Sequence, residues 1–351
     1  MRPAGPADQY RAWAGQAVDA LQRWYNPGTG LWRTAGWWNS ANALTAVIQH
    51  SQRTGEQRHR PVIETTFSRA RRVYPGFSNQ YYDDDGWWAL AWIAAFDLTG
   101  DARFLDLARG LFAGMAAGWD DVCGGGLWWT RRKTYKNAIP NELFLLIAGR
   151  LHQRAGGYLD WALREWRWFR SSGLIGPAGL VNDGLTADCL NNGRTTWTYN
   201  QGVIISALAV LAAITDDDAY LDQADAIATA ALRDLIVPPG ILTEPGERQT
   251  GRRDRDRPQF KGIFVRHLYE LHQYRPRSAY RDFILANATS LWQNSRNHRN
   301  QIGLSWTGPF DRADATRQTS ALDALNAAVT LTDGTGPGEP RPGDLGPAPP
   351  P

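Results

Sequence analysis

The sequence of 351 residues contains only two cysteines and shows no excess of charge of either sign. Two cysteines, Cys123 and Cys189, cannot staple a chain of this length, which excludes a disulfide-rich scaffold. We expect two free thiols in preference to a single disulfide between them. The 38 basic and 35 acidic residues give a net charge of +3. Because a nucleic-acid-binding protein concentrates basic residues on one face, this balance argues against that class.

Long apolar runs are also missing. No segment reaches the roughly 18 apolar residues of a membrane helix, so we expect no association with a membrane. The first eight residues lack the apolar core of a signal peptide, which predicts a cytoplasmic protein, or a secreted one if a leader has been removed. Residues 334–351 are rich in glycine and proline and are expected to form a disordered tail. Residues 1–333 then form a single domain.

Several common catalytic motifs are absent. The sequence has no HExxH zinc motif, no CxxC pair, no GxSxG nucleophile elbow and no GxxxxGK phosphate loop. His267, Glu270 and His272 resemble metal ligands, but the two histidines are five residues apart and are poorly aligned on one helix face. We therefore expect neither a metal nor a cofactor, and we expect a monomer.

Tryptophan, by contrast, is abundant, with 17 residues. Several occur in pairs beside glycine, asparagine or aspartate: Trp37-Trp38, Trp87-Trp88 and Trp128-Trp129. Part of this set packs the core, but rings next to turn residues also suit stacking on the C–H face of a pyranose. Among the 38 basic residues the lysines are Lys133, Lys136 and Lys261. One interpretation is that these lysines fill a role that arginine cannot, for example that Lys261 lines a sugar-binding cup. The alternative is that codon usage favours arginine in this sequence and that the three lysines remain by chance.

The apolar periodicity is helical almost throughout. Amphipathic segments alternate with segments that are apolar all round, as outer and inner helices would. The amphipathic segments are residues 8–24, 60–73, 101–117, 157–171, 217–236 and 278–294. The apolar segments are residues 38–53, 85–98, 140–154, 200–214, 261–274 and 317–331. Starts of the apolar segments recur roughly every 50–60 residues, a period typical of stacked or ringed repeats. Six such pairs predict an all-α (α/α)6 barrel, with an open solenoid as the alternative.

The connections between these segments are unequal in length. Those that lead from an apolar segment to the next amphipathic one are short. The long ones precede each apolar segment, at residues 25–37, 74–84, 118–139, 172–199, 237–260 and 295–316. In a ring, all the long loops emerge at one end. Because long loops in compact domains are usually functional, we expect a cup lined by aromatic and carboxylate groups at that end.

Three consecutive carboxylates, Asp83, Asp84 and Asp85, lie at the predicted start of an inner helix between two aromatic pairs. Capping the helix accounts for one or two of them. It does not account for three beside apolar rings, where repulsion and lost hydration push the pKa values apart. A raised and a low pKa side by side are what a general acid and a nucleophile require. We therefore interpret the triplet as catalytic.

Four motifs at loop-to-inner-helix junctions carry a family resemblance. They are Asp83-Asp84-x-Gly86-Trp87-Trp88, Lys136 to Glu142 (KNAIPNE), Thr198 to Gly202 (TYNQG) and Phe260 to Arg266 (FKGIFVR). Each motif alone is weak, but four in order over roughly residues 20–330 are specific. On these motifs the sequence resembles glycoside hydrolase family 76, the endo-α-1,6-mannanases and their fungal cell-wall relatives. The family fold is an (α/α)6 barrel, in agreement with the helix pattern.

The resemblance implies retaining hydrolysis of α-1,6-mannosidic bonds, with α-mannan or mannooligosaccharides as substrate. Asp83 would be the nucleophile and Asp84 the acid/base, and Asp85 is expected to cap the helix. A shift by one, with Asp84 and Asp85 as the pair, is the alternative register. Expected sugar contacts are Trp38, Asn42, Trp88, Trp129, Asn141, Tyr199, Gln201 and Lys261. Asp183 is either a further polar contact or a turn residue.

Other activities stay open from the sequence. A transglycosylase would pass the glycosyl group to a sugar acceptor on a cell-wall or lipid-linked glycan. A non-catalytic glycan-binding protein would use the same aromatic cup, although it has no need of adjacent carboxylates. An epimerase or lyase of the same fold would use histidine, and no histidine lies in a long loop near the acidic motif.

Overall fold

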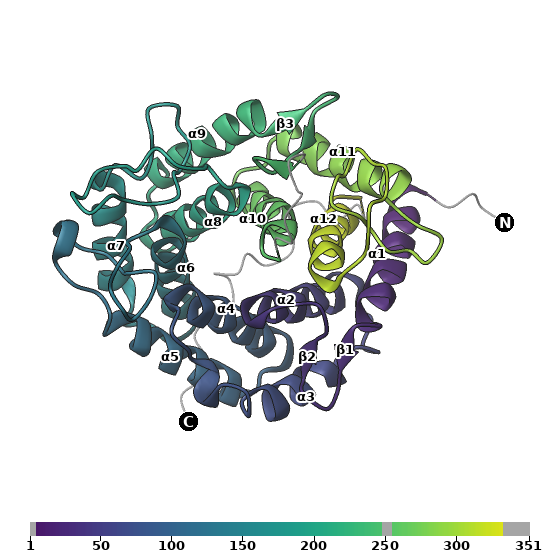
Figure 1. Ribbon diagram of the computed structural model, residues 1–351, viewed down its shortest axis with the longest axis horizontal. Helices are drawn as coiled ribbons and strands as arrows, with labels where there is room; N and C mark the ends of the chain where they lie inside the picture. The colour runs from purple at the N-terminus through teal and green to yellow at the C-terminus, as the bar shows by residue number, and fades with distance from the viewer. Residues whose placement is uncertain (1–4, 248–254, 333–351) are drawn as a thin grey trace.

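The structure is a computed structural model that describes residues 5–247 and 255–332. Twelve α-helices in these residues form two concentric rings (Figure 1). The inner ring consists of α2 (Trp37–Thr54), α4 (Tyr82–Thr99), α6 (Ala138–Ala155), α8 (Thr198–Thr215), α10 (Phe260–Tyr274) and α12 (Ala315–Thr332). The outer ring consists of α1 (Pro6–Gln22), α3 (Pro61–Ala70), α5 (Ala102–Ala116), α7 (Leu159–Ser171), α9 (Ala219–Asp234) and α11 (Ser278–Asn294).

The double ring is closed. Each inner helix packs against the next, and α12 packs against both α2 and α1, so the last described helix meets the first (Figure 1). This confirms the predicted (α/α)6 barrel and excludes the open solenoid. The expected tail at residues 334–351 lies outside the described residues.

Burial explains the alternation of helix types. The inner helix α8 is buried continuously from Thr198 to Ala212. The outer helix α5 instead buries a single face, made of Phe104, Ala108, Leu111, Phe112 and Met115. By length and composition α8 is apolar enough to cross a membrane, which the sequence analysis did not expect. Because 83% of that helix is buried inside the ring, its apolar character serves the core.

Close approach between inner helices explains two motif glycines. A Cβ at Gly202 of α8 would lie 2.7 Å from Cα of Phe264, and a Cβ at Gly262 of α10 would lie 2.4 Å from the backbone of Ser320. Any side chain there would push neighbouring inner helices apart. These motif positions therefore serve helix packing.

Short regular elements interrupt the loops. They are the hairpins β1 (Tyr25–Asn26) with β2 (Leu31–Trp32) and β3 (Ile236–Val237) with β4 (Ile241–Leu242), and the 3-10 turns η1 (Pro75–Phe77), η2 (Val122–Gly124) and η4 (Arg257–Gln259). Both hairpins are antiparallel and lie in long loops that precede inner helices.

The long loops gather at one end of the barrel, as predicted. Hydrogen bonds join neighbouring loops and helix starts: Tyr82 N to Trp129 O (3.0 Å), Ala138 N to Asp183 O (2.9 Å), Thr198 N to Glu244 Oε1 (3.1 Å) and Ala315 N to Thr34 Oγ1 (2.9 Å). We call this end the mouth of the barrel.

The two cysteines correct the expectation of free thiols. Cys123 and Cys189 form a disulfide that joins the loop before α6 to the loop before α8. The residues are 66 positions apart in sequence. Sequence spacing does not reveal that the ring places their loops side by side at the mouth.

Candidate active site

The acidic triplet occupies the first turn of α4 at the mouth. The helix begins at Tyr82 after Tyr81, which caps it without any side-chain hydrogen bond. Asp83 is half-buried, and Asp84 and Asp85 are buried. The first turn therefore holds three carboxylates in a largely dry environment at the end where the helix dipole favours negative charge.

Asp85 anchors the preceding loop. Its Oδ1 accepts from the backbone N–H of Asn79 (3.2 Å), and its Oδ2 accepts from Ser78 Oγ (3.1 Å) and from the Arg131 guanidinium (2.7 Å). Burial raises the pKa of Asp85, and the Arg131 charge opposes that rise. The expectation that Asp85 caps the helix is wrong, since its carboxylate faces the loop and Arg131.

The same anchoring position recurs around the inner ring. In five of the six inner helices the fourth residue accepts a hydrogen bond from a backbone N–H of the preceding long loop. The pairs are Ser40 with Trp32 (3.4 Å), Asp85 with Asn79 (3.2 Å), Asn141 with Leu127 (2.6 Å), Gln201 with Val181 (2.7 Å) and Gln318 with Ile302 (3.0 Å). Asp85 thus does for α4 what an amide or hydroxyl does elsewhere. This favours Asp83 and Asp84 as the pair available for chemistry.

Asp83 presents one bonded and one unbonded oxygen. Its Oδ2 accepts from the indole N–H of Trp129 (3.2 Å), and its buried Oδ1 has no hydrogen-bond partner among the described residues. Burial raises the pKa of Asp83 well above its usual range, and the neighbouring Asp84 charge raises it further. A carboxylate oxygen without a partner is free to act as a nucleophile or to receive a proton.

Asp84 is held by Asn79. Its Oδ2 accepts from the Asn79 amide at 2.6 Å, and Asn79 is itself fixed through its backbone by Asp85. Burial raises the pKa of Asp84 to about 7, against the opposing effect of the Asn79 hydrogen bond. The pKa values of Asp83 and Asp84 are thus both raised, which corrects the expectation of one raised and one low value, and the pair retains a proton near neutral pH.

A cavity opens beside Asn79. It has a volume of about 420 Å³ and is lined by Tyr74, Ser78, Asn79, Gln80, Tyr81 and Arg131. Tyr81 is 39% exposed, and its ring lies 5.1 Å from the ring of Trp129, which is 37% exposed. The carboxylate pair is thus flanked by two accessible rings and by polar groups that can bind hydroxyls.

Aromatic rings from four inner helices form one connected cluster. Ring centroids are 5.7 Å apart for Trp38 and Trp87, 6.4 Å for Trp87 and Tyr199, 3.9 Å for Tyr199 and Phe260, and 6.1 Å for Phe260 and Trp38. Trp38 is half-buried, with its N–H donated to Asp256 (2.9 Å), whereas Trp87 and Tyr199 are buried. Of the predicted sugar contacts, Trp38 and Trp129 keep ring surface at the mouth.

Five other predicted sugar contacts have structural placements instead. The side-chain amides of Asn141 and Gln201 each accept from a loop N–H through their oxygen and donate to a loop carbonyl through their nitrogen. Asn42 accepts from Arg266 (2.6 Å) and donates to Trp38 O (3.4 Å). Trp88 is fully enclosed among other aromatic rings. None of these groups offers an atom to a sugar in this arrangement, because each is buried.

Lys261 is the fifth. Its ammonium is buried, lies 2.7 Å from Glu247 and donates to Leu304 O (2.8 Å). Burial lowers the pKa of Lys261, and Glu247 opposes this. The hypothesis that Lys261 lines the cup is not supported, since the side chain ties two loops beneath the mouth.

A second polar group near the mouth was not predicted as a unit. Asp183 accepts from the hydroxyl of Tyr135 and from the indole N–H of Trp197 (3.0 Å). Glu142 is fully buried without a hydrogen-bond partner among the described residues, and burial together with Asp183 raises its pKa well above the usual range. Glu142 is the last residue of the motif Lys136 to Glu142, but nothing in the sequence indicates that its carboxyl group is buried without a partner. Among the described residues no cluster of three or more His, Cys, Asp or Glu forms a metal site.

Comparison with known proteins agrees with this geometry. The family model of glycosyl hydrolase family 76 matches residues 11–336. A putative mannan endo-1,6-alpha-mannosidase of Schizosaccharomyces pombe is 27% identical over 74% of this chain, and the chain spans 64% of that relative's length. The mannan endo-1,6-alpha-mannosidase DFG5 of Candida albicans is 26% identical over 84% of this chain and 72% of its own length.

Solved structures show the same fold. The α-1,6-mannanase GH76A of a Salegentibacter species superposes with a TM-score of 0.82 at 25% identity and covers 92% of this chain and 99% of its own. Dfg5 from Chaetomium thermophilum, solved with glucosamine, superposes with a TM-score of 0.83 at 21% identity and covers 92% of this chain and 90% of its own. The fold similarity therefore extends over nearly the whole described barrel.

Proposed function

The chain belongs to glycosyl hydrolase family 76, and on that premise we propose that it is an endo-acting, retaining hydrolase of α-1,6-mannosidic bonds. The observation that carries the assignment of residues is the adjacent pair of half-buried Asp83 and buried Asp84, next to Asp85, whose carboxylate is bonded to the preceding loop and to Arg131. Adjacent carboxylates that share a proton suit a glycosidase, which needs a nucleophile and an acid.

A family relative supports the importance of such a pair. Two variants of the Salegentibacter enzyme, solved with α-1,6-mannotetrose and α-1,6-mannotriose, are described as inactive and carry replacements at two consecutive aspartates. In the present chain, Asp83 and Asp84 are consecutive aspartates at the mouth whose oxygens are not all engaged by loop backbone. We assign the two catalytic roles to them.

In the first step, Asp83 as carboxylate attacks the anomeric carbon of a mannosyl unit. The glycosidic C–O bond breaks, and Asp84 donates its proton to the departing oxygen. In the second step, Asp84 as carboxylate takes a proton from water, and the water oxygen displaces Asp83 from the anomeric carbon. Both carboxyl groups return to their starting states, and the product keeps the configuration of the substrate.

This sequence of steps requires the shared proton on Asp84, although burial also raises the pKa of Asp83 well above its usual range before substrate binds. Asn79 holds Asp84, while the unpartnered Oδ1 of Asp83 is available for attack. A positive charge that develops at the anomeric carbon stabilises the ionised form of Asp83 and therefore favours this distribution. Trp129 keeps the other oxygen of Asp83 in place through its N–H.

The test is incubation with linear α-1,6-mannan, followed by sizing of products and NMR of the newly formed anomeric centre. We expect a ladder of α-configured oligosaccharides early in the reaction. Release of mannose alone would contradict endo action, and a β-anomer as first product would contradict retention. Longer products in the presence of an added mannobiose acceptor would show transglycosylation, and unchanged polymer with measurable binding would show a glycan-binding protein.

We also propose that the chain acts in an oxidising compartment. The disulfide between Cys123 and Cys189 supports this, because such bonds persist where thiols are not kept reduced. Thiol alkylation and mass spectrometry of protein taken from its native host would test the proposal. Alkylation of both cysteines without prior reduction would contradict it.

A further inference from the structure

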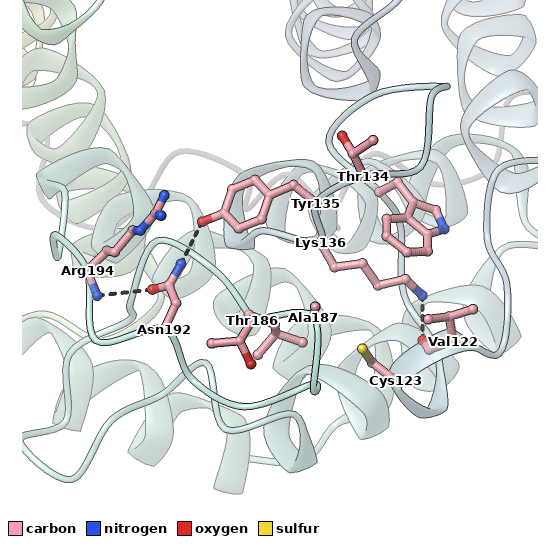
Figure 2. A pocket seen from close by; sticks show the side chains of 11 residues that line it. Val122, Cys123, Thr134, Tyr135, Lys136, Thr186, Ala187, Asn192 and Arg194 are labelled. Atoms are coloured by element: carbon pink, nitrogen blue, oxygen red, sulfur yellow. Dashed lines mark hydrogen bonds between the residues drawn. The ribbon is translucent and has the colours of Figure 1, made fainter.

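We propose that a second cavity at the mouth binds a single hexose that branches from the mannan backbone, an inference that rests on the proposed function. The cavity has a volume of about 330 Å³ and lies between the loop before α6 and the loop before α8 (Figure 2). Its lining includes the rings of Trp128 and Tyr135 and the side chains of Thr134, Thr186, Asn192 and Arg194.

The cavity is connected to the catalytic pair through one loop segment. Tyr135 lines it and also binds Asp183, and the carbonyl of Tyr135 accepts from the backbone N–H of Trp129 (2.7 Å). Trp129 in turn holds Asp83 through its indole. One short loop segment therefore connects the wall of the cavity to the proposed nucleophile. A hexose in the cavity would therefore contact the same loop segment that holds the proposed nucleophile.

The lining has the chemistry of a sugar site. Aromatic faces suit the C–H surface of a pyranose, and hydroxyl, amide and guanidinium groups suit its hydroxyls. The Lys136 ammonium is already bonded to Asp120 (2.9 Å) and to the carbonyls of Val122 and Gly125 (both 2.6 Å). The Arg194 side chain is exposed, and within residues 5–247 and 255–332 it has no hydrogen bond or ion pair. Its five donors are therefore available to a ligand.

The cavity is held in shape before any ligand arrives. The disulfide joins the two loops, with Cys123 in the lining. The Asn192 amide donates to the Tyr135 hydroxyl (2.9 Å), and its oxygen accepts from the backbone N–H of Arg194 (3.0 Å; Figure 2). Because a preformed site loses little freedom on binding, even one hexose can contribute to affinity.

Shape favours a branch over a backbone unit. In Figure 2 the labelled side chains surround the hollow, with Tyr135 on one side and Thr186 and Ala187 on the other. A continuing polymer needs a groove that is open at both ends, whereas a single terminal unit needs only a hollow of its own size. The volume lies near the lower limit of ligand cavities, roughly 300 Å³, which suits one ring.

The experiment compares two polymers, linear α-1,6-mannan and the same backbone with single α-1,2-linked mannosyl branches. Ala187→Trp fills the cavity, and Ala187→Ser is its matched control. Arg194→Ala removes the unpaired donors at an exposed position that is not part of the proposed catalytic machinery. We expect Ala187→Trp and Arg194→Ala to lower kcat/KM on the branched polymer by about tenfold and to leave the linear polymer within about twofold. Ala187→Ser should match the wild type on both.

The outcomes separate the two proposals. If the wild type cleaves linear mannan but not the branched polymer, the branch site is overturned and the proposed function stands. Equal losses on both polymers, or no loss for either variant on the branched one, would also overturn the branch site. If the wild type cleaves neither polymer, the proposed function fails and the branch site fails with it. Because Arg194 is exposed, its variant keeps the test valid if Ala187→Trp does not fold.

Discussion

The tripeptide Asp-Asp-Asp occurs at two places, at the start of α4 and after the end of α8. At residues 83–85 the carboxylates are largely buried at the mouth. At residues 216–218 all three are exposed at the opposite end of the ring. There Asp216 ends α8 in the left-handed conformation, and Asp217 Oδ1 accepts from the backbone N–H of Ala219 (2.9 Å) at the start of α9.

The difference shows that the same three side chains serve two purposes. The exposed triplet does what capping chemistry predicts for aspartate between helices. The buried triplet has one member that anchors a loop and two with raised pKa values and incomplete hydrogen bonding. The two triplets have the same residue type, so the difference in their roles comes from burial and from the long loop that precedes residues 83–85.

The largest expected contrast concerns Asp83. Asp83→Ala removes the group that forms the covalent intermediate, so kcat should fall by at least about 10⁴-fold on every substrate. Asp217→Ala, in the exposed triplet, should leave kcat within about twofold. Initial rates on linear α-1,6-mannan measure both. Activity that survives in Asp83→Ala and is lost in an Asp85→Asn enzyme would shift the catalytic pair by one residue.

The next contrast separates the two members of the pair. Asp84→Ala should lower kcat on mannan by about 10² to 10⁴-fold, because protonation of the leaving oxygen is lost. An aryl α-mannoside with a good leaving group needs less protonation, so its first step should be spared. Added azide should restore the second step and yield a mannosyl azide, since azide needs no base. Absence of azide rescue would remove the acid/base role from Asp84.

A third test uses stability against pH. The pKa of Asp84 is about 7 in the folded protein, above its value of about 3.9 in an unfolded chain, because burial disfavours the charge. The wild type therefore loses stability as pH rises from about 4 to 7. Asp84→Asn lacks this loss and should gain on the order of 2 to 4 kcal/mol relative to the wild type at pH 8, with little gain at pH 4. Urea unfolding at several pH values measures it, and a gain that does not change with pH would contradict the argument.

The smallest contrast compares anchoring with capping. Asp85→Asn replaces two acceptors by one acceptor and one donor, so at least one of the three groups bonded to Asp85 loses its partner. We expect a loss of about 1 to 3 kcal/mol in unfolding free energy and a lower kcat, because Asn79 then no longer holds Asp84 firmly. Asp217→Asn should cost about 0.5 kcal/mol, since asparagine caps nearly as well. Equal losses at the two sites would contradict the anchoring role of Asp85.

The fold followed from the sequence because its cause is local and repeated. Alternating helix types, short returns such as Gly100, and long loops before every inner helix are visible along the chain. The acidic triplet at residues 83–85 is recognisable for the same reason, because three adjacent carboxylates between aromatic pairs stand out in the sequence itself.

The roles of single polar residues were not predictable in this way. Asn141 and Gln201 stand at motif positions, and their residue type suits both sugar hydroxyls and loop backbone. Only the fourth position of an inner helix distinguishes a loop anchor from a sugar contact. To recognise that position, the start of the helix must be known to within one residue. The disulfide and the buried ammonium of Lys261 likewise depend on which loops meet at the mouth.

Ring closure has a consequence for how the protein is made. The α12 helix closes the ring by bonding to α1, to α2 and to the loop before α2. Gln318 donates to Ala17 O (3.0 Å), Asn326 donates to Ala46 O (3.0 Å) and the Ala315 N–H donates to Thr34 Oγ1 (2.9 Å). During synthesis from the N-terminus, the α1 and α2 surfaces that α12 covers stay open until α12 has left the ribosome. We therefore expect the nascent barrel to pass through an incomplete state in which these surfaces of α1 and α2 are uncovered, which is a hazard for aggregation.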